Sequence, residues 1–236
     1  MIKALRLLAA VAVVSIPAAG FAKPAAKPAA AKSATDWTKT YSVTSEGGFR
    51  VGDPDAKVAL VEYGSLTCPH CKHFADKGGQ PLLQNYIRTG KVSYEFRPMI
   101  LNGIDLAATL VARCGGPSHF FPITAKLYAT QDSWASKISN MPEDEKNKLK
   151  ALPVGQMMAG IAEKGGLVSF AAANGIPAAK AEACLKDDAA ASKLAQMYQA
   201  AMDKGVKGTP TFFVNGKHVD AIDWPTLEPF LKGAGT

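Results

Sequence analysis

Two short segments predict neighbouring β-strands. Val58–Tyr63 (VALVEY) is almost continuously apolar, which is typical of a strand covered on both faces. Val92–Arg97 (VSYEFR) alternates like a further strand. Between them, residues 68 to about 90 carry a helical pattern, with an expected interruption at residues 78–81. Strand, helix and strand in this order predict a βαβ unit, and Trp37–Val43 is expected to add an edge strand.

The middle of the chain predicts a block of helices. From about residue 104 to residue 205, the sequence is rich in Ala, Lys, Leu and Met, and Gly and Pro separate the helix-like stretches. The expected helices are 105–114, 119–130, 142–151, 156–164, 167–173 and 178–203.

The last part of the chain predicts a β-hairpin and a closing helix. Thr211–Val214 and Lys217–Val219 flank Asn215-Gly216, a pair that favours a two-residue hairpin turn. Trp224–Leu231 is expected to be helical, with Asp223 as its N-cap. The predicted order is therefore a βαβ unit, a helical block, a hairpin and a helix, which is an α/β fold.

The N-terminal residues predict export rather than structure. Residues 1–22 have the pattern of a signal peptide, with a basic start, an apolar stretch and small residues around Phe21. A permanent membrane anchor is the alternative, but the apolar stretch is short for a span. Residues 23–35 (KPAAKPAAAKSAT) predict a flexible linker, because they cannot bury enough apolar area to become ordered. We therefore expect a periplasmic protein, in a compartment where disulfides persist.

The net charge changes once these segments are set aside. The 236-residue chain has 27 Lys and Arg against 20 Asp and Glu, a formal charge of +7. Five of the basic residues lie before Asp36, and the remaining 22 leave a net charge of only +2. No basic stripe with interleaved aromatic residues remains, so nucleic acid is not an expected partner. The apolar fraction of 47% excludes a disordered chain, and the length fits one domain with an insertion or two small domains.

The Cys68-Pro69-His70-Cys71 motif predicts a redox site at the start of a helix. Residues three apart share one face of the first helical turn, so the two sulfurs can close a disulfide ring. The positive end of the helix stabilises a thiolate on Cys68, the expected nucleophile, while Cys71 lies deeper and resolves mixed disulfides. His70 is expected to donate a hydrogen bond or positive charge to Cys68, which makes the disulfide a stronger oxidant.

Two other interpretations of the motif are weaker. A zinc knuckle would use the two cysteines with His70 and His73, but a second C-x-x-C or a His pair at metal spacing is absent. A purely structural disulfide is disfavoured because so small a ring constrains the unfolded chain very little.

Glu62 lies six residues before Cys68, inside the apolar strand. An unpaired carboxylate is costly there, so we interpret Glu62 as a proton acceptor for Cys71, a role that suits a raised pKa. The alternative is a strand-end glutamate that reaches solvent. Lys57 and Glu95 are expected to be surface charges.

A proline stands just before the predicted hairpin, in Gly208-Thr209-Pro210-Thr211. Proline at the start of a sheet is awkward unless its peptide bond is cis and the chain turns there. With a cis bond, Thr209 would expose backbone groups beside Cys68, where an extended polypeptide can pair as an added strand. An ordinary loop proline is the alternative.

VEYGSLTCPHC, followed about 140 residues later by GTPTFFVNG, resembles the DsbA family of periplasmic thiol:disulfide oxidoreductases. The resemblance covers roughly residues 36–233 and implies a thioredoxin fold whose βαβ and ββα halves enclose an inserted helical domain at about 104–205. It also implies a DsbB-like quinone-linked membrane oxidase as partner, and no cofactor beyond the redox-active disulfide. The implied catalytic residues are the nucleophile Cys68, its buried partner Cys71, the thiolate stabiliser His70 and the buried acid Glu62. The implied substrate-binding residues are Thr209, Pro69 and Pro210, the last with a cis bond.

Thr209 departs from the best-known members of that family, which have Val at this position. Thr is more familiar from the DsbC and DsbG isomerases, so the balance of oxidase and isomerase activity stays open. Those isomerases carry a longer N-terminal dimerisation module that a short linker cannot supply, so we expect a monomer.

Cys114 and Cys184 are a second departure, because both fall in the helical block. With Cys68 and Cys71 paired locally, they would form a structural disulfide that closes a loop of about 70 residues. Two buried free thiols are the alternative, but an oxidising compartment favours the bridge, which also resembles some alphaproteobacterial DsbA homologues. His119 and His218 are expected at the surface.

The leading hypothesis is an exported dithiol oxidase that introduces disulfides into unfolded exported polypeptides through Cys68 and Cys71. The first alternative is a disulfide isomerase or reductase that uses the same site. From another class, a periplasmic chaperone or binding module with an incidental CPHC motif is a remote alternative.

Overall fold

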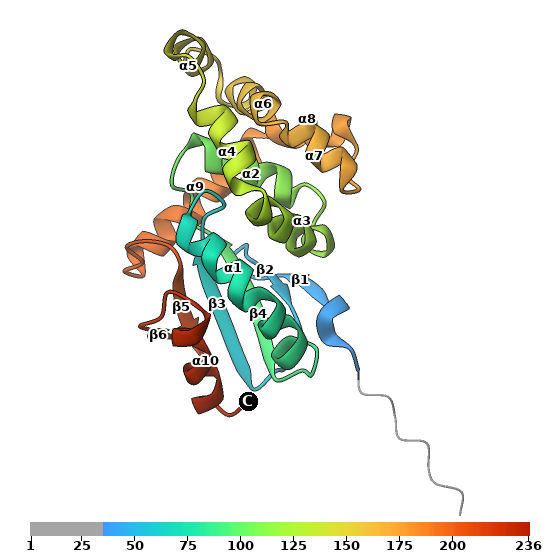
Figure 1. Ribbon diagram of the computed structural model, residues 1–236, viewed down its shortest axis with the longest axis vertical. Helices are drawn as coiled ribbons and strands as arrows, with labels where there is room; N and C mark the ends of the chain where they lie inside the picture. Colours follow the sequence, from blue (N-terminus) through green and yellow to red (C-terminus); the bar gives the residue numbers. More distant parts are fainter. Residues whose placement is uncertain (1–34) are drawn as a thin grey trace, which may run out of the picture. The chain divides into compact units, whose positions relative to one another are not determined.

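The computed structural model describes residues 35–236 (Figure 1). The predicted signal peptide (residues 1–22) and all but the last residue of the predicted linker (residues 23–35) lie outside the described residues. Within residues 35–236, one six-stranded sheet has the order β1-β2-β4-β3-β5-β6. Its strands are β1 (Tyr41–Val43), β2 (Phe49–Val51), β3 (Val58–Gly64), β4 (Val92–Pro98), β5 (Thr211–Val214) and β6 (Lys217–Val219).

Most helices lie between β4 and β5 in sequence. The remaining helices pack around the sheet. In chain order they are η1 (Trp37–Lys39), α1 (Pro69–Pro81), η2 (Leu82–Ile87) and α10 (Trp224–Gly233). The helical block consists of α2 (Gly103–Arg113), α3 (Pro117–Ala129), α4 (Gln131–Ser139), α5 (Glu143–Lys150), α6 (Val154–Gly165), α7 (Leu167–Ala173), α8 (Ala178–Leu185) and α9 (Asp188–Asp203). No helix among residues 35–236 is long and apolar enough to cross a membrane.

The two predicted halves of the fold meet at β3. This strand pairs in parallel with β4, to which α1 and η2 connect it, and antiparallel with β5. β5 and β6 form the predicted hairpin, with Asn215 and Gly216 at positive φ in its turn. The predicted α/β thioredoxin fold is therefore confirmed.

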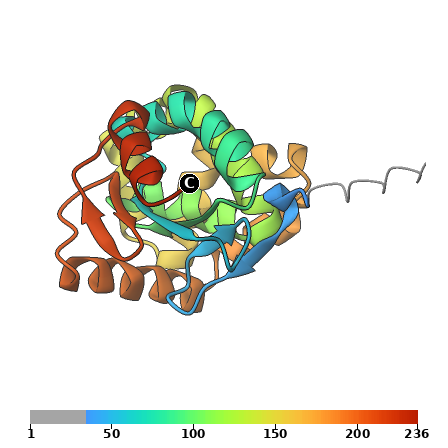
Figure 2. The same cartoon turned by 90° about the horizontal axis from the view of Figure 1, so that it is seen from below.

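Both faces of β3 are covered, which explains its almost continuous apolar sequence. Leu60 packs on the side of α1 and α10, whereas Tyr63 belongs to a small cluster with Ala201 at the end of α9. Figure 2 shows α1 and α10 above the sheet and α9 below it. Because side chains alternate along a strand, Glu62 shares the face of Leu60 and lies on the side of α1.

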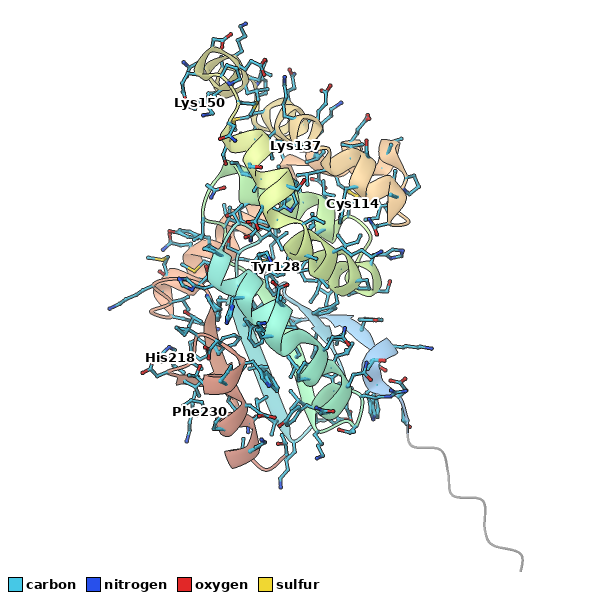
Figure 3. The ribbon with its side chains drawn as sticks, viewed as in Figure 1. Cys114, Tyr128, Lys137, Lys150, His218 and Phe230 are labelled. Carbon is cyan, nitrogen blue, oxygen red and sulfur yellow. A yellow bond between two sulfur atoms is a disulfide. The ribbon has the colours of Figure 1, made fainter. Side chains whose placement is uncertain are left out.

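The helical block is joined to the sheet by a shared apolar core. Phe120 of α3 packs against Phe49 of β2 and Phe96 of β4, with ring centroids 5.1 and 5.4 Å apart. A disulfide joins Cys114, at the end of α2, to Cys184 in α8, with their Cα atoms 5.8 Å apart (Cys114 is labelled in Figure 3). The described residues 35–236 belong to one compact unit.

The structure differs from the sequence prediction at several helices. The interruption predicted near Gly78-Gly79 is wrong, because α1 runs through both residues, whereas at Pro81 the α-helix does end and the π-helical turn η2 follows. Gly78 serves close packing instead, since a Cβ there would come within 2.9 Å of Trp224. The single helix predicted at 178–203 is divided, because Asp187 caps a new helix, α9, with its carboxylate.

Two short elements were not predicted. α4 is a mostly polar helix that buries only Gln131, Trp134 and Ile138, so its apolar periodicity is weak. β2 is three residues long and pairs with both β1 and β4.

The predicted surface position of Glu95 is wrong. Glu95 is 7% exposed, and its carboxylate accepts hydrogen bonds from Thr44 (2.6 Å) and from Nε of Arg97 (2.7 Å). Side chains alternate along β4, and Glu95 points inward. Its hydrogen bonds with Arg97 and Thr44 offset the cost of burying the carboxylate. Lys57, His119 and His218 are exposed as expected.

Candidate active site

Cys68 is the N-cap residue of α1. Its backbone is extended, and Pro69 begins the helix, a position where the missing N–H of proline costs nothing. The backbone N–H of Cys71 lies 3.4 Å from the Cys68 sulfur. Both residues are free thiols, with Cys68 5% and Cys71 0% exposed. The helix therefore presents its unpaired N–H groups to one sulfur and buries the other.

The pKa values of the two thiols are shifted in opposite directions. The pKa of Cys68 is lowered to about 5, chiefly because the Cys71 thiol donates a hydrogen bond to its thiolate, with help from the backbone N–H groups of Cys71 and His70. Burial raises the pKa of Cys71 well above the ordinary value. At neutral pH, Cys68 is therefore a thiolate and Cys71 a protonated thiol, which leaves a single nucleophile.

A role for the His70 imidazole in stabilising the Cys68 thiolate stays a prediction. The residue is exposed, and within residues 35–236 no hydrogen bond joins its imidazole to the Cys68 sulfur. Its backbone N–H is the group that favours the thiolate. His70 thus helps to lower the pKa of Cys68 through its backbone N–H at the start of α1.

The Thr209–Pro210 peptide bond is cis, as the sequence analysis expected. The bend brings the carbonyl oxygen of Thr209 within 3.2 Å of the Cys68 sulfur. Pro210 is buried, whereas Pro69 is exposed on the other side of the nucleophile. The loop before β5 and the start of α1 are therefore neighbours across about 140 residues of sequence.

Glu62 lies inside the molecule on the α1 face of β3. It is 1% exposed, which rules out the alternative of a glutamate that reaches solvent. Tyr94 donates a hydrogen bond of 2.6 Å to Oε2, while Oε1 is buried without a partner among the described residues. Burial raises the pKa of Glu62 to about 8, and its charge raises the pKa of Cys71 in turn. The two groups are thus electrostatically coupled.

A cavity of about 480 Å³ lies under α1 and reaches Glu62. Aromatic side chains from the sheet and from α3, including Tyr94 and Phe121, form part of its lining. Glu62 is therefore both buried and at the border of a cavity.

Three side chains of the helical block hold the loop before Cys68, and the sequence analysis missed all of them. Gln131 donates hydrogen bonds to the carbonyl oxygens of Leu66 (2.8 Å) and Cys68 (3.1 Å). Tyr128, labelled in Figure 3, donates to the carbonyl oxygen of Ser65 at 3.1 Å. These polar groups are buried, so each bond fixes the loop more firmly than an exposed bond does.

Asp105 binds the same loop by accepting a hydrogen bond from one of its backbone N–H groups. Its carboxylate accepts hydrogen bonds of 2.9 Å from the backbone N–H groups of Leu66 and Leu101, and the residue is 0% exposed. Burial raises its pKa to about 6. A signal for Asp105 was present in the sequence, because it is the one acidic residue in an apolar helical stretch that begins after Asn102, the N-cap of α2.

Replacing Asp105 by alanine should lower the free energy of unfolding by about 2–4 kcal/mol, because two buried N–H groups lose their acceptor. Asp105→Asn keeps one acceptor oxygen and should cost roughly half as much. Urea denaturation of the three proteins measures both changes. An alanine variant as stable as the wild type would show that the loop does not depend on this carboxylate.

No group of three or more His, Cys, Asp or Glu residues in the described part of the chain is arranged to hold a metal ion. The chemistry that the arrangement can perform is thiol–disulfide exchange, because it pairs an ionised thiol with a buried, protonated one.

Comparison with known proteins agrees with this chemistry. The thioredoxin family model matches residues 44–233. A Rickettsia bellii protein named "Putative protein-disulfide oxidoreductase" is 32% identical over 184 residues, which cover 75% of this chain and 62% of the relative. A Rickettsia prowazekii protein of the same kind is 30% identical over 181 residues, 76% of this chain and 58% of the relative. This chain therefore spans less than two thirds of the length of these relatives.

Two solved structures share the fold. A protein-disulfide isomerase from Novosphingobium aromaticivorans is 30% identical, with a TM-score of 0.74 over 79% of this chain and 97% of that chain. The alpha-DsbA1 structure from Wolbachia pipientis is 22% identical, with a TM-score of 0.63 over 78% of this chain and 89% of that one. The family model covers most of the chain and shows that the chain belongs to the thioredoxin family.

Proposed function

We propose that this protein is an exported dithiol oxidase that donates the Cys68–Cys71 disulfide to unfolded polypeptides. The observation that carries the proposal is the opposite acidity of the two thiols. A low pKa at Cys68 stabilises the reduced protein relative to the disulfide, and this stabilisation makes the disulfide a stronger oxidant.

The reaction proceeds in two exchanges. A substrate thiolate attacks the Cys68 sulfur, the Cys68–Cys71 bond breaks, and Cys71 leaves as a thiolate that takes up a proton. A second substrate thiolate then attacks the substrate sulfur of the mixed disulfide, and Cys68 leaves as a stable thiolate. The substrate loses two electrons and gains one disulfide, and the protein becomes the dithiol.

Glu62 is the proposed proton donor and acceptor for Cys71. With a pKa of about 8 it is protonated at neutral pH, so it can supply a proton when the buried Cys71 leaves as a thiolate. The bond from Tyr94 to Oε2 fixes the orientation of the carboxyl group. When the protein is reoxidised, the Cys71 thiol loses this proton and the Glu62 carboxylate accepts it.

Thr209 and Pro210 are the proposed substrate-binding residues, together with Pro69. The cis bond places Thr209 beside the nucleophile, where the backbone of an extended polypeptide can pair with it. We further propose a monomer located in the periplasm and reoxidised by a DsbB-like quinone-linked membrane enzyme, with no other cofactor.

Isomerase or reductase activity is the second candidate. It is favoured by Thr209, which departs from the residue of the best-known oxidases, and by the name of the 30% identical Novosphingobium aromaticivorans protein, a protein-disulfide isomerase. Both activities use Cys68 and Cys71, so only a functional assay separates them.

The test is to mix the oxidised protein with a reduced, unfolded protein that has several cysteines and to count the disulfides that form. An oxidase should transfer one disulfide per molecule. Its reduction potential, measured against glutathione, should lie nearer to that of the oxidant DsbA (about −120 mV) than to that of the reductant thioredoxin (about −270 mV). A scrambled substrate provides the comparison. Efficient repair of its disulfides, with little net transfer to the reduced substrate, would contradict the oxidase proposal and support the isomerase.

A further inference from the structure

A second cavity lies within the helical block, and we call it the Arg113 cavity. It is bounded by the end of α2, the first half of α9 and the Cys114–Cys184 disulfide, and its volume is about 330 Å³. This size is at the small end of the range for small-molecule sites. Neither Cys68 nor Cys71 lines it, so it is separate from the candidate active site. Its apolar wall is formed by Phe49, Leu110 and Leu194.

Arg113 is held in place at this cavity without an acidic partner. Its Nη2 donates a 2.8 Å hydrogen bond to the carbonyl oxygen of Gly47, and its guanidinium lies 4.0 Å from the ring centroid of Phe49. Nη1 is buried without a hydrogen-bond partner, and none of the ion pairs formed by the described residues includes Arg113. The side chain is therefore fixed, and part of its hydrogen-bonding capacity is unused.

The charge of Arg113 is costly in this position. Burial lowers its pKa to about 10, so the guanidinium is still charged at neutral pH. A partly buried charge is stabilised when a counter-charge accompanies it, and residues 35–236 supply none within ion-pair distance. An anion bound from solution would meet this need.

Two other charged residues line the Arg113 cavity. Lys193 forms no ion pair within the described residues either. Asp187 is the N-cap of α9, and its Oδ1 already accepts hydrogen bonds from the N–H groups of Ala189 (2.9 Å) and Ala190 (3.0 Å). Two cations and one carboxylate engaged with the helix leave an excess of positive charge at the cavity.

We propose that the Arg113 cavity binds a small organic oxyanion, a carboxylate or a phosphate on an apolar body. The flat guanidinium donates parallel hydrogen bonds to either group, and Lys193 adds a second positive charge. The apolar body contacts Phe49, Leu110 and Leu194. The site needs no exchange at Cys68, so it is independent of the proposed oxidase activity.

An NMR titration of the whole protein tests the proposal with three probes: benzoate, phenyl phosphate and the uncharged benzyl alcohol. Benzoate, phenyl phosphate or both should cause saturable shifts of the backbone amides of Gly47 and Ala190, and benzyl alcohol should not. Binding of only one of the two anions would identify the preferred oxyanion and would support the proposal. No saturable shift with either anion, or equal affinity for the alcohol, would overturn it.

Two exposed residues supply a matched pair of variants that should change the affinity in opposite directions. Asp187→Asn keeps a side-chain oxygen for the helix cap but removes the negative charge, so it should tighten anion binding about two- to fivefold. Lys193→Gln should weaken it by a similar factor. Arg113→Met should weaken it about tenfold or more. Unchanged affinity in Asp187→Asn and Lys193→Gln, whose folding is not at risk, would also overturn the proposal.

Discussion

Alkylation of the reduced protein is expected to occur at Cys68 alone, with a rate that falls only about twofold between pH 7 and pH 5. Only the thiolate reacts, and with a pKa of about 5 Cys68 is almost fully ionised at pH 7 and half ionised at pH 5. For an ordinary thiol with a pKa near 9, the alkylation rate falls about 100-fold between pH 7 and pH 5. Below pH 5, the rate for Cys68 should fall about tenfold per pH unit.

The measurement is the rate of iodoacetamide labelling from pH 3 to pH 9, with mass spectrometry to identify the labelled cysteine. Cys71 should stay unlabelled in the folded protein, because it is buried and its pKa is raised. A midpoint near pH 8 or above would contradict both the assigned acidity and the oxidase mechanism built on it.

Two variants at position 71 identify the cause of the low pKa. The hydrogen bond from the Cys71 side chain is its largest cause. Cys71→Ser keeps a donor at this position, so the midpoint for Cys68 should stay well below that of an ordinary thiol. Cys71→Ala removes the donor, and the midpoint should rise. Equal midpoints in the two variants would assign the effect to the helix terminus instead.

Removal of the Cys114–Cys184 disulfide should lower the free energy of unfolding by about 4 kcal/mol. The bridge joins residues 70 apart, and loop-closure entropy assigns that stabilisation to the restriction of the unfolded chain. Replacing both cysteines by alanine removes the bridge without leaving a free thiol.

The comparison is best made by urea denaturation in a Cys68→Ser/Cys71→Ser background, so that the redox state of the active site cannot differ between the samples. The dependence of the unfolding free energy on urea should also become steeper, because the unbridged unfolded chain exposes more surface. A loss below about 1 kcal/mol would show that the bridge does not restrict the unfolded chain as loop closure requires.

The features predicted correctly depend on short stretches of sequence. β3 follows from a run of apolar residues, β4 from alternation, and the hairpin from Asn215-Gly216. The position of Cys68 and Cys71 at the start of α1 follows from the C-x-x-C spacing. The cis bond at Pro210 was predicted because proline immediately before a strand permits few alternatives. In each case, the residues that fix the structure are near neighbours in the chain.

The features that were missed depend on contacts between distant residues. Gln131 and Tyr128 lie in ordinary helical sequence, and nothing near them indicates that they bind a loop more than 60 residues away. Glu95 was assigned to the surface although Arg97 is a near neighbour, and its other compensating partner, Thr44, is 51 residues distant. The side-chain role of His70 stays a prediction, because the C-x-x-C motif fixes the spacing of the cysteines but not the position of the exposed imidazole.

The bonds from Asp105, Tyr128 and Gln131 to the loop before Cys68 determine how the protein can be re-engineered. Excision of residues 103–203 to obtain a smaller enzyme would remove all three anchors of the nucleophile's loop along with the insertion. The helical block is thus part of the catalytic scaffold and not an exchangeable module. A chimera that takes this block from a relative must carry equivalents of these three side chains to keep the loop before Cys68 in place.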